Sequence, residues 1–408
     1  MPHDRLDATL AGHVAGLQEA GTAKGAETVV VGASAPDGTR GPRFELAGQG
    51  DRQFIRMNSN SYLGMGLHGD VIGAEEATAA RFGAGPGAVR FISGTYDTHL
   101  RLEASLAGFH GRDAGMIFSA AYTAILGTIT SLVTKETVLI SDALNHNCII
   151  NAMRLSRPVG KAIYPHLDYA ALEEAIVAAK GTAKRALVVT DGVFSMRGDH
   201  AELDHIMDIA RCHDDAFEDN CVVVVDDSHG VGAFGPSGRG TEEYCNSAPV
   251  DILVGTLGKA LGVNGGYVVG SDALIDFLRE SAPMYIYSNP ITPAEAAAAN
   301  KSVQILDSPE GMRLLENLRA LTARFQQGLL ALGLETIPGD HPVVPLMLRD
   351  TDRTHATVKH LFANGVLATG LAFPVVPRGD EEIRFQVNAD HTEGDIDTVL
   401  GILESFNE

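Results

Sequence analysis

The sequence has little of what secreted, membrane-spanning or nucleic-acid-binding proteins need. The four cysteines show no C-x-x-C pair and no regular spacing, so we expect reduced thiols in a cytoplasmic protein. No apolar run reaches the roughly 18 residues of a membrane span, and the first ten residues carry charges where a signal peptide has its apolar core. The net charge of −21, from 52 acidic and 31 basic residues, argues against nucleic acid or an anionic membrane as a partner.

What the chain does have is the composition of a large globular protein, with 408 residues of which 45% are hydrophobic and 20% charged. Between residues 114 and 269, short apolar runs alternate with helical patterns, which predicts a mostly parallel sheet with helices on both faces. We therefore predict an α/β fold in three parts: an N-terminal helix and hairpin segment (1–57), a large domain (58–290) and a small C-terminal α/β domain (291–408).

The first of these parts has two recognisable patterns. Apolar residues recur at helical spacing over Asp4–Ala20, which predicts an amphipathic helix. Thr28–Gly32 and Arg43–Ala47 flank the turn-rich stretch ASAPDGTRG, which predicts a pair of strands.

Polar residues follow two short runs in the middle of the chain, CVVVV and DILV. Their lack of alternation is typical of parallel strands that are covered on both faces. Asp226 and His229 follow the first run, and Thr256 and Lys259 follow the second. Because ligands of open parallel sheets bind beyond the carboxyl ends of the strands, we predict that these four side chains converge on one site.

This set of side chains suits pyridoxal 5′-phosphate (PLP). Lys259 lies among small residues in GTLGKALG, where partial desolvation makes an amine a usable nucleophile that can form a Schiff base with an aldehyde cofactor. A buried Asp226 would keep the ring nitrogen protonated, so that the ring can accept electrons. Thr256 lies on a glycine-rich turn and can offer its hydroxyl and backbone N–H to a phosphate.

Three other kinds of site fit the sequence less well. GVGAFG matches the dinucleotide-binding pattern, but DDSH separates it from the strand and PSG follows where a helix should begin. GTLGKA resembles a P-loop only at its Gly-Lys pair. Asp226, Asp227 and His229 could bind a metal, but no other Cys/His pair shows ligand spacing, so we expect no metal site.

The motifs VDDSHGVGAFGPSGRG and GTLGKALG strongly resemble those of the α-oxoamine synthases, which are fold-type-I PLP enzymes, and most of all the glycine C-acetyltransferase pattern. The resemblance extends from Asn58 to the C-terminus through SNSYLGMG, AVRFISGTYDTHLRLE, SDALNHNCIINA, TDGVFSMRGD, YIYSNPITP, GLAFPVVPRG and IRFQVNADHT. It implies a large PLP-binding domain with a mostly parallel sheet and a smaller C-terminal α/β domain.

The resemblance also implies roles for individual residues. Lys259 would carry PLP and remove the α-proton, His146 would stack on the ring, and His229 would bind the 3′ oxygen and polarise the thioester carbonyl. The implied cofactor-binding residues also include Ala121, Tyr122, Ser195, Asp226, Thr256, Ser288 and Asn289, and the implied substrate-binding residues are Asn60, Arg90 and Arg384. Local explanations compete for some of these residues, such as a turn-forming asparagine at 60 or an ordinary surface arginine at 90.

The activity implied by the resemblance is the condensation of a small amino acid with an acyl-CoA, with release of CoA. The preferred substrates are glycine and acetyl-CoA, and the product is an α-amino-β-ketoacid or, after decarboxylation, an α-aminoketone. The equivalents of Ser288 and Asn289 reach the phosphate in the neighbouring subunit, which implies a homodimer with its active sites at the interface.

Two departures from the acetyltransferase pattern keep other substrates open. KALGVNGGY is one residue shorter and closer in length to the serine palmitoyltransferase-like pattern, and GAGPGAVRF adds a proline-containing turn near the acyl entrance. The alternatives are the aminolevulinate, amino-oxononanoate and serine palmitoyltransferase types of the family, followed by a PLP aldolase or aminotransferase of the same fold. A non-catalytic subunit of a heteromeric synthase would lack the lysine that stands here at 259.

Overall fold

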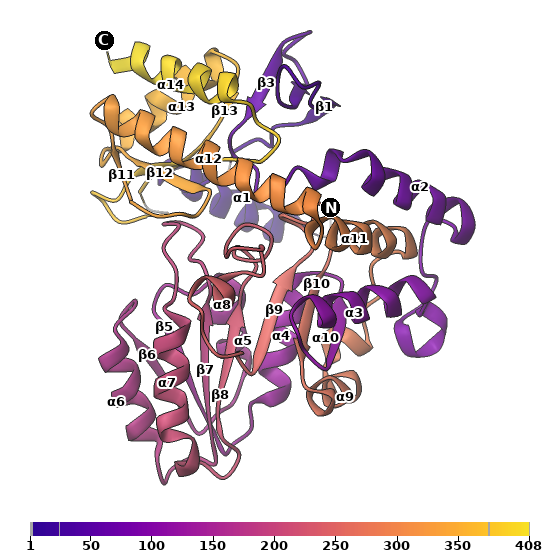
Figure 1. Ribbon diagram of the computed structural model, residues 1–408. Coiled ribbons are helices and arrows are strands. Elements are labelled where there is room, and N and C mark those ends of the chain that lie inside the picture. Colours follow the sequence, from indigo (N-terminus) through magenta and orange to yellow (C-terminus); the bar gives the residue numbers. More distant parts are fainter. Residues whose placement is uncertain (1–2, 24, 374–375, 408) are drawn as a thin grey trace. The chain divides into compact units, whose positions relative to one another are not determined.

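The computed structural model describes residues 3–23, 25–373 and 376–407, which form two compact units. The large unit comprises Asn60–Ala320 with Gly339–Pro342, and the terminal unit comprises Met1–Ser59, Leu321–Pro338 and Val343–Glu408 (Figure 1). The predicted boundaries at 57/58 and 290/291 do not coincide with the limits of these units. In the structure, the N-terminal segment is grouped with the C-terminal strands in one unit. Two residues of the motif GLAFPVVPRG, at positions 374 and 375, lie outside the described ranges.

The large unit is built on a seven-stranded sheet, counted within the described residues, in the order β4-β10-β9-β8-β7-β5-β6. Its strands are β4 (Ala114–Phe118), β5 (Thr137–Asp142), β6 (Gly160–Tyr164), β7 (Arg185–Asp191), β8 (Cys221–Asp226), β9 (Ile252–Thr256) and β10 (Gly266–Gly270). All neighbours from β9 to β6 are parallel, which confirms the predicted sheet, whereas β10 is antiparallel to both β9 and β4. The connection from β9 to β10 is too short for the crossover that a parallel pair requires.

Helices cover this sheet on both faces. They are α2 (Gly69–Phe82), α3 (Asp97–Phe109), α4 (Ala121–Leu132), α5 (Asn147–Leu155), α6 (Tyr169–Ala179), α7 (Leu203–His213), α8 (Thr241–Tyr244), α9 (Asp272–Ser281), α10 (Pro283–Ile286) and α11 (Pro293–Leu306), with short turns at Met65–Leu67, Arg90–Gly94 and Asp214–Ala216. On one face, Ile129 of α4 and Ile149 of α5 share a buried cluster with Leu187 and Val224 of the sheet. On the other face, α6 and α7 pack against β5, β6 and β8 (Figure 1).

The terminal unit has two small sheets. One has the order β1 (Val30–Ser34), β2 (Arg43–Leu46), β3 (Gln53–Arg56), β13 (Val366–Leu367), and the other β11 (Glu335–Thr336), β12 (Val343–Met347), β15 (Glu382–Gln386), β14 (Thr369–Leu371). The antiparallel β1–β2 pair confirms the predicted strands, and the parallel β3–β13 pair joins the N-terminal segment to the C-terminal part. The helices are α1 (Asp4–Glu19), the end of α12 (Pro309–Ala331), α13 (Thr351–Ala363) and α14 (Glu393–Asn407).

The first helix of the terminal unit confirms the predicted helix, but its apolar side chains lie exposed in the single chain. Leu6, Leu10 and Val14 are each more than half exposed, at 56%, 55% and 51%. Within the described residues, no helix is long and apolar enough to cross a membrane.

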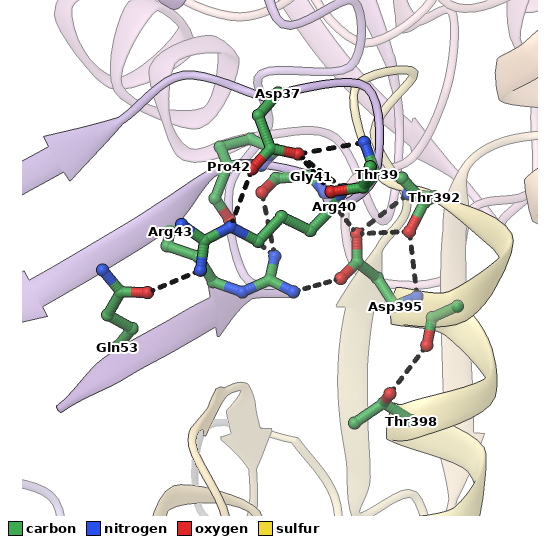
Figure 2. Close-up of polar contacts among 11 residues, drawn as sticks. Asp37, Thr39, Arg40, Gly41, Pro42, Arg43, Gln53, Thr392, Asp395 and Thr398 are labelled. Carbon is green, nitrogen blue, oxygen red and sulfur yellow. Dashed lines mark hydrogen bonds and ion pairs between the residues drawn. The ribbon is translucent and has the colours of Figure 1, made fainter.

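A buried carboxylate fastens the N-terminal hairpin to α14 (Figure 2). Asp395 accepts a hydrogen bond from the Gly41 N–H at 2.9 Å and pairs with the Arg43 guanidinium. The hydroxyl and N–H of Thr392 donate to the same carboxylate, each at 2.9 Å. Burial would raise the pKa of Asp395, but the Arg43 pair and the N–H donors hold it below its usual value. Only glycine fits at 41, because a Cβ there would lie 2.5 Å from the Asp395 oxygen.

Candidate active site

A cavity of about 290 Å³ lies at the carboxyl edge of the central sheet. The parallel strands β7, β8 and β9 end at this edge in Asp191, Asp226 and Thr256. The structure brings eight of the predicted site residues together around the cavity: Ala121, Tyr122, His146, Ser195, Asp226, His229, Thr256 and Lys259. The predicted convergence at the strand ends is therefore observed.

The two successive aspartates at the end of β8 point to different environments. Asp226 lines the cavity, and its Oδ1 accepts a hydrogen bond from the Ser228 N–H at 3.2 Å. Asp227 is fully buried and accepts from the N–H and hydroxyl of Thr241, at 2.8 and 2.6 Å. Burial raises the pKa of Asp227 to about 7, although the Thr241 hydrogen bonds oppose the rise. A Cβ at Gly240 would approach the Asp227 carboxylate to 1.9 Å, so Asp227 fits only beside glycine.

Lys259 lies in the tight loop between β9 and β10. The Leu257 N–H donates to the Gly265 carbonyl at 2.9 Å, and the Gly262 N–H donates to the Lys259 carbonyl at the same distance. Gly262 has a φ of 71°, and a Cβ on it would lie 2.3 Å from the backbone nitrogen of Gly66. The glycines of GTLGKALGVNGG therefore let the loop close tightly, which holds the half-buried Lys259 at the cavity.

The N-terminus of α4 forms another wall of the cavity. A Cβ on Gly266 would lie 2.2 Å from the Ala121 nitrogen, so glycine allows β10 to approach the start of this helix. Ala120 precedes the helix and has no polar side chain to cap its first N–H groups. These groups, the positive end of the helix dipole and the Thr256 hydroxyl, which also lines the cavity, have the chemistry that a phosphate requires.

His146 is the residue that caps the N-terminus of α5. Its Nδ1 accepts a hydrogen bond from the Cys148 N–H at 3.3 Å, and its own backbone N–H donates to Asp191 at 2.8 Å. Burial lowers the pKa of His146, with the charge of Lys259 acting in the same direction and that of Asp226 against it. The imidazole is therefore neutral at neutral pH and presents a flat ring to the cavity.

A second group of aromatic and imidazole side chains surrounds His229. The Tyr62 hydroxyl lies 2.7 Å from His229 Nδ1 and 3.3 Å from Asn60 Oδ1. His341 Nε2 lies 2.9 Å from the His229 carbonyl oxygen. Neither Tyr62 nor His341 lies near His229 in the chain, so no sequence pattern indicates these two contacts. Tyr62 connects His229 to Asn60, the predicted ligand of a substrate carboxylate.

Asp191 and Cys148 also line the cavity and were not predicted. Asp191 lies opposite Asp226 in the register of β7 and β8, and burial, together with the nearby Asp226, raises its pKa well above the usual value. Its position at the end of an apolar run, in VVTDGVF, is the same signal that identified Asp226. Cys148 has no such signal, because an isolated cysteine is usually an inert core residue.

The structure does not bring every predicted residue to this cavity. Arg90 is buried, and its guanidinium forms a bidentate ion pair with Glu103, at 3.0 and 3.2 Å, and a hydrogen bond to Thr95. The interpretation of Arg90 as a surface arginine is therefore wrong, and its guanidinium is engaged within its own unit. Ser288 and Asn289 do not line the cavity of their own chain as the structure describes it.

The roles of two further predicted residues, Arg384 and Asn60, stay predictions. Arg384 lies in β15 of the terminal unit, so its predicted contact with a substrate carboxylate is untested. Asn60 belongs to the large unit and is half-buried beside Tyr62.

The residues around the cavity fit PLP in kind. Lys259 offers an amine for the aldehyde, Asp226 a carboxylate for the ring nitrogen, and His146 a neutral ring for stacking. The start of α4 and the Thr256 hydroxyl offer donors for the phosphate. Each part of the cofactor has a partner of matching chemistry.

The comparisons with known proteins agree with this donor set. The model of the aminotransferase class I and II family matches residues 52–403. The chain is 39% identical over 356 residues to 8-amino-7-oxononanoate synthase of Bacillus pumilus, covering 87% of this chain and 88% of that protein. It is 37% identical to the enzyme of the same name from Citrifermentans bemidjiense, covering 91% and 92%. A solved serine palmitoyltransferase from Sphingomonas wittichii superposes with a TM-score of 0.88 at 27% identity, covering 99% of this chain and 97% of that one.

The expected glycine C-acetyltransferase is not among these relatives, and its closeness stays unconfirmed. All of the enzymes just named are α-oxoamine synthases, as the sequence motifs predicted. The chain belongs to the aminotransferase class I and II family and, within it, to the PLP-dependent α-oxoamine synthases.

Proposed function

We propose that this enzyme condenses alanine with a heptanedioyl thioester, such as the CoA ester, to form 8-amino-7-oxononanoate. The sequence-based preference for glycine and acetyl-CoA is not supported by the relatives, and the amino-oxononanoate alternative fits them better. The observation that carries the proposal is the 39% identity, over most of the chain, with an enzyme of this name.

The two substrates follow from the carbon skeleton of the product. A nonanoate with a ketone at carbon 7 keeps seven carbons of a dicarboxylic acyl group. Carbons 8 and 9, with the amino group, are what remains of alanine after its carboxyl group leaves as CO₂. The new bond joins the acyl carbonyl carbon to the α-carbon of alanine, the thioester bond breaks, and the thiol leaves with a proton.

Within this proposal, the residues around the cavity hold the reactants and move one proton. When bound, PLP supplies an electron sink for the negative charge that remains as the α-proton leaves. The Lys259 amine takes that proton, and the Asp226 carboxylate holds a proton on the ring nitrogen. His229, whose Nδ1 lies 2.7 Å from the Tyr62 hydroxyl, and Ser195 are assigned to the 3′ oxygen of the cofactor.

The proposal includes partners for the substrate and for the chain. We assign the amino-acid carboxylate to Asn60 and Arg384, because a guanidinium pairs with a carboxylate through two parallel hydrogen bonds. We also propose a homodimer in which Ser288 and Asn289 complete the phosphate site of the partner. The position of Asn289, exposed in the single chain and outside its cavity, supports this assignment.

A matrix of substrates tests the proposed reaction. Purified enzyme is assayed for free CoA with alanine, glycine or serine, each combined with acetyl-, heptanedioyl- or palmitoyl-CoA. We expect kcat/KM to be highest for alanine with heptanedioyl-CoA, by at least about tenfold, which corresponds to roughly 1.4 kcal/mol of discrimination. Serine with palmitoyl-CoA is the second candidate, because solved serine palmitoyltransferases share this fold. A higher value for glycine with acetyl-CoA, or for the serine pair, would refute the proposal.

A further inference from the structure

The Cys148 thiol lies between two groups of the PLP cavity. Its Sγ is 2.9 Å from His146 Nδ1 and 3.5 Å from Asp226 Oδ2, and the side chain is only 2% exposed. Burial and the neighbouring carboxylates of Asp226 and Asp191 raise the pKa of Cys148, so the group remains a thiol with one proton to donate.

The hydrogen bonds around His146 define its tautomer. The Cys148 backbone N–H donates to Nδ1 at 3.3 Å, so Nδ1 must have its lone pair free to accept. In a neutral imidazole the ring proton is then on Nε2. The thiol has one proton and faces two acceptors, Nδ1 at 2.9 Å and the Asp226 carboxylate at 3.5 Å, so the nearer Nδ1 shares its lone pair between the S–H and the backbone N–H.

We infer that Cys148 is a positioning residue, whose thiol donates to Nδ1 and holds His146 in the neutral form with its proton on Nε2. A thiol in this position favours the orientation in which the ring faces the cavity. The sulfur also packs 3.5 Å from Oδ2 of the Asp226 carboxylate, whose Oδ1 is held by the Ser228 N–H. The inference needs only the cofactor that the family uses, and it is independent of the identity of the amino acid and acyl group.

The charged groups that surround this contact are Asp191, Asp226 and Lys259. Asp191 accepts from the His146 backbone N–H, so the turn is fixed from that side as well. The charges of Asp226 and Lys259 act on the His146 pKa in opposite directions. Loss of the thiol therefore shifts the balance between neutral and protonated imidazole beside the cofactor.

Binding of PLP to the apoprotein tests the inference without any substrate. Three variants are titrated with PLP: Cys148→Ala, which removes the donor, Cys148→Ser, which keeps one, and Cys212→Ala, which removes an exposed thiol of α7 as a control. We expect the Kd for PLP to rise about tenfold in Cys148→Ala, because tenfold corresponds to roughly 1.4 kcal/mol, which lies within the range for one hydrogen bond. It should rise less than about threefold in Cys148→Ser and remain unchanged in the control. The pH at which the visible cofactor band changes should move only in Cys148→Ala.

A double-mutant cycle distinguishes positioning from simple packing. His146→Phe keeps a flat ring but removes Nδ1, so a further Cys148→Ala change should then raise the Kd by less than about threefold. If the effects of the two substitutions multiply, the thiol acts independently of His146 and the inference is wrong. The same holds if Cys148→Ser binds PLP as poorly as Cys148→Ala. Should Cys148→Ala not fold, Cys148→Ser alone decides: weak PLP binding by this folded variant overturns the inference, and near-normal binding with an unmoved pH profile supports it.

Discussion

At the scale of single residues, position at the end of a strand determines which of two neighbouring carboxylates takes part in chemistry. Successive strand residues point to opposite faces, so Asp226 faces the cavity while Asp227 is buried against Thr241. The same type of side chain is therefore the proposed cofactor partner in one case and holds a loop in place in the other.

Substitution of each aspartate by asparagine should separate these two roles. Asp226→Asn should lower kcat/KM on the order of a thousandfold or more, because the ring nitrogen loses the carboxylate that keeps it protonated. Asp227→Asn should reduce the rate much less, but it should lower the free energy of unfolding by roughly 1–3 kcal/mol, because a buried hydrogen-bond network is disturbed. Steady-state kinetics and urea unfolding measure the two effects. Equal losses of rate would contradict the assignment.

At the scale of elements, the loop that carries Ser195 is held by His166. His166 Nδ1 lies 3.0 Å from Asp142, its Nε2 lies 3.4 Å from Asp199, and its ring packs edge-on against Phe194. Burial opposes protonation, but the two carboxylates raise the pKa of His166 to about 9. A protonated imidazole therefore joins the end of β5 to this loop.

The stabilisation that His166 provides through Asp142 and Asp199 should depend on pH. Because the folded pKa lies above the unfolded value, the stabilisation is fully present below pH 6.5 and is lost as the pH rises through about 9. The difference between 6.5 and about 9 corresponds to at most about 3.5 kcal/mol at roughly 1.4 kcal/mol per pH unit. In denaturant unfolding, His166→Gln should be less stable than wild type at pH 6, and the gap should narrow by pH 10. The control is His205→Gln, because His205 forms an exposed pair with Glu202. If the loss of unfolding free energy in His166→Gln does not depend on pH, the proposed role of the protonated imidazole is wrong.

The N-terminal hairpin offers a second prediction at this scale. Asp395→Ala should lower the free energy of unfolding by about 3–5 kcal/mol, since it leaves the Arg43 guanidinium and the Gly41 N–H without their buried acceptor. Asp37→Ala removes a similar contact to Arg40 that is about half exposed, and should cost much less, because solvent weakens the attraction between exposed charges (Figure 2). Chemical unfolding measures both variants. Similar losses in the two would show that burial of the Asp395 pair contributes nothing.

The sequence predicts site residues whose position depends on local patterns, and it misses residues whose contacts join distant parts of the chain. Asp226 and Lys259 follow apolar runs directly, so their place at the sheet edge could be predicted from strand patterns. Tyr62 meets His229 across 167 residues of sequence, and His341 meets it across 112, so no local pattern indicates either contact. Arg90 was predicted to bind substrate, with a surface arginine as the alternative, because no local pattern indicates its ion pair with Glu103, 13 residues further along the chain.

The same limit applied to the fold. The strand–helix alternation predicted the parallel sheet, and the β1–β2 pair followed from its turn-rich connection. The pairing of β3 with β13, more than 300 residues apart, could not be predicted from either segment. The N-terminal segment was therefore assigned to a part of its own, whereas the structure places it with the C-terminal strands.

At the scale of the whole molecule, the proposed homodimer predicts complementation between chains. A mixed dimer of one Lys259→Ala chain with one Ser288→Ala, Asn289→Ala chain should contain one site with all the changes and one with none. Activity should therefore partly return on mixing, although each parent dimer is impaired. Cofactor retention should also fall on dilution, because assembly and PLP binding are linked. A fully active, PLP-saturated monomer in size-exclusion chromatography would refute the shared site.

The proposed chemistry depends on Lys259, because this residue would carry the cofactor. The most direct measurement is borohydride reduction of the PLP-loaded protein, followed by proteolysis and mass spectrometry of the labelled peptide. Wild-type protein should carry PLP on the single peptide that contains Lys259, and Lys259→Ala should carry none and lack turnover. A stable PLP adduct on Lys259→Ala, or a label on another lysine of the wild type, would contradict the account.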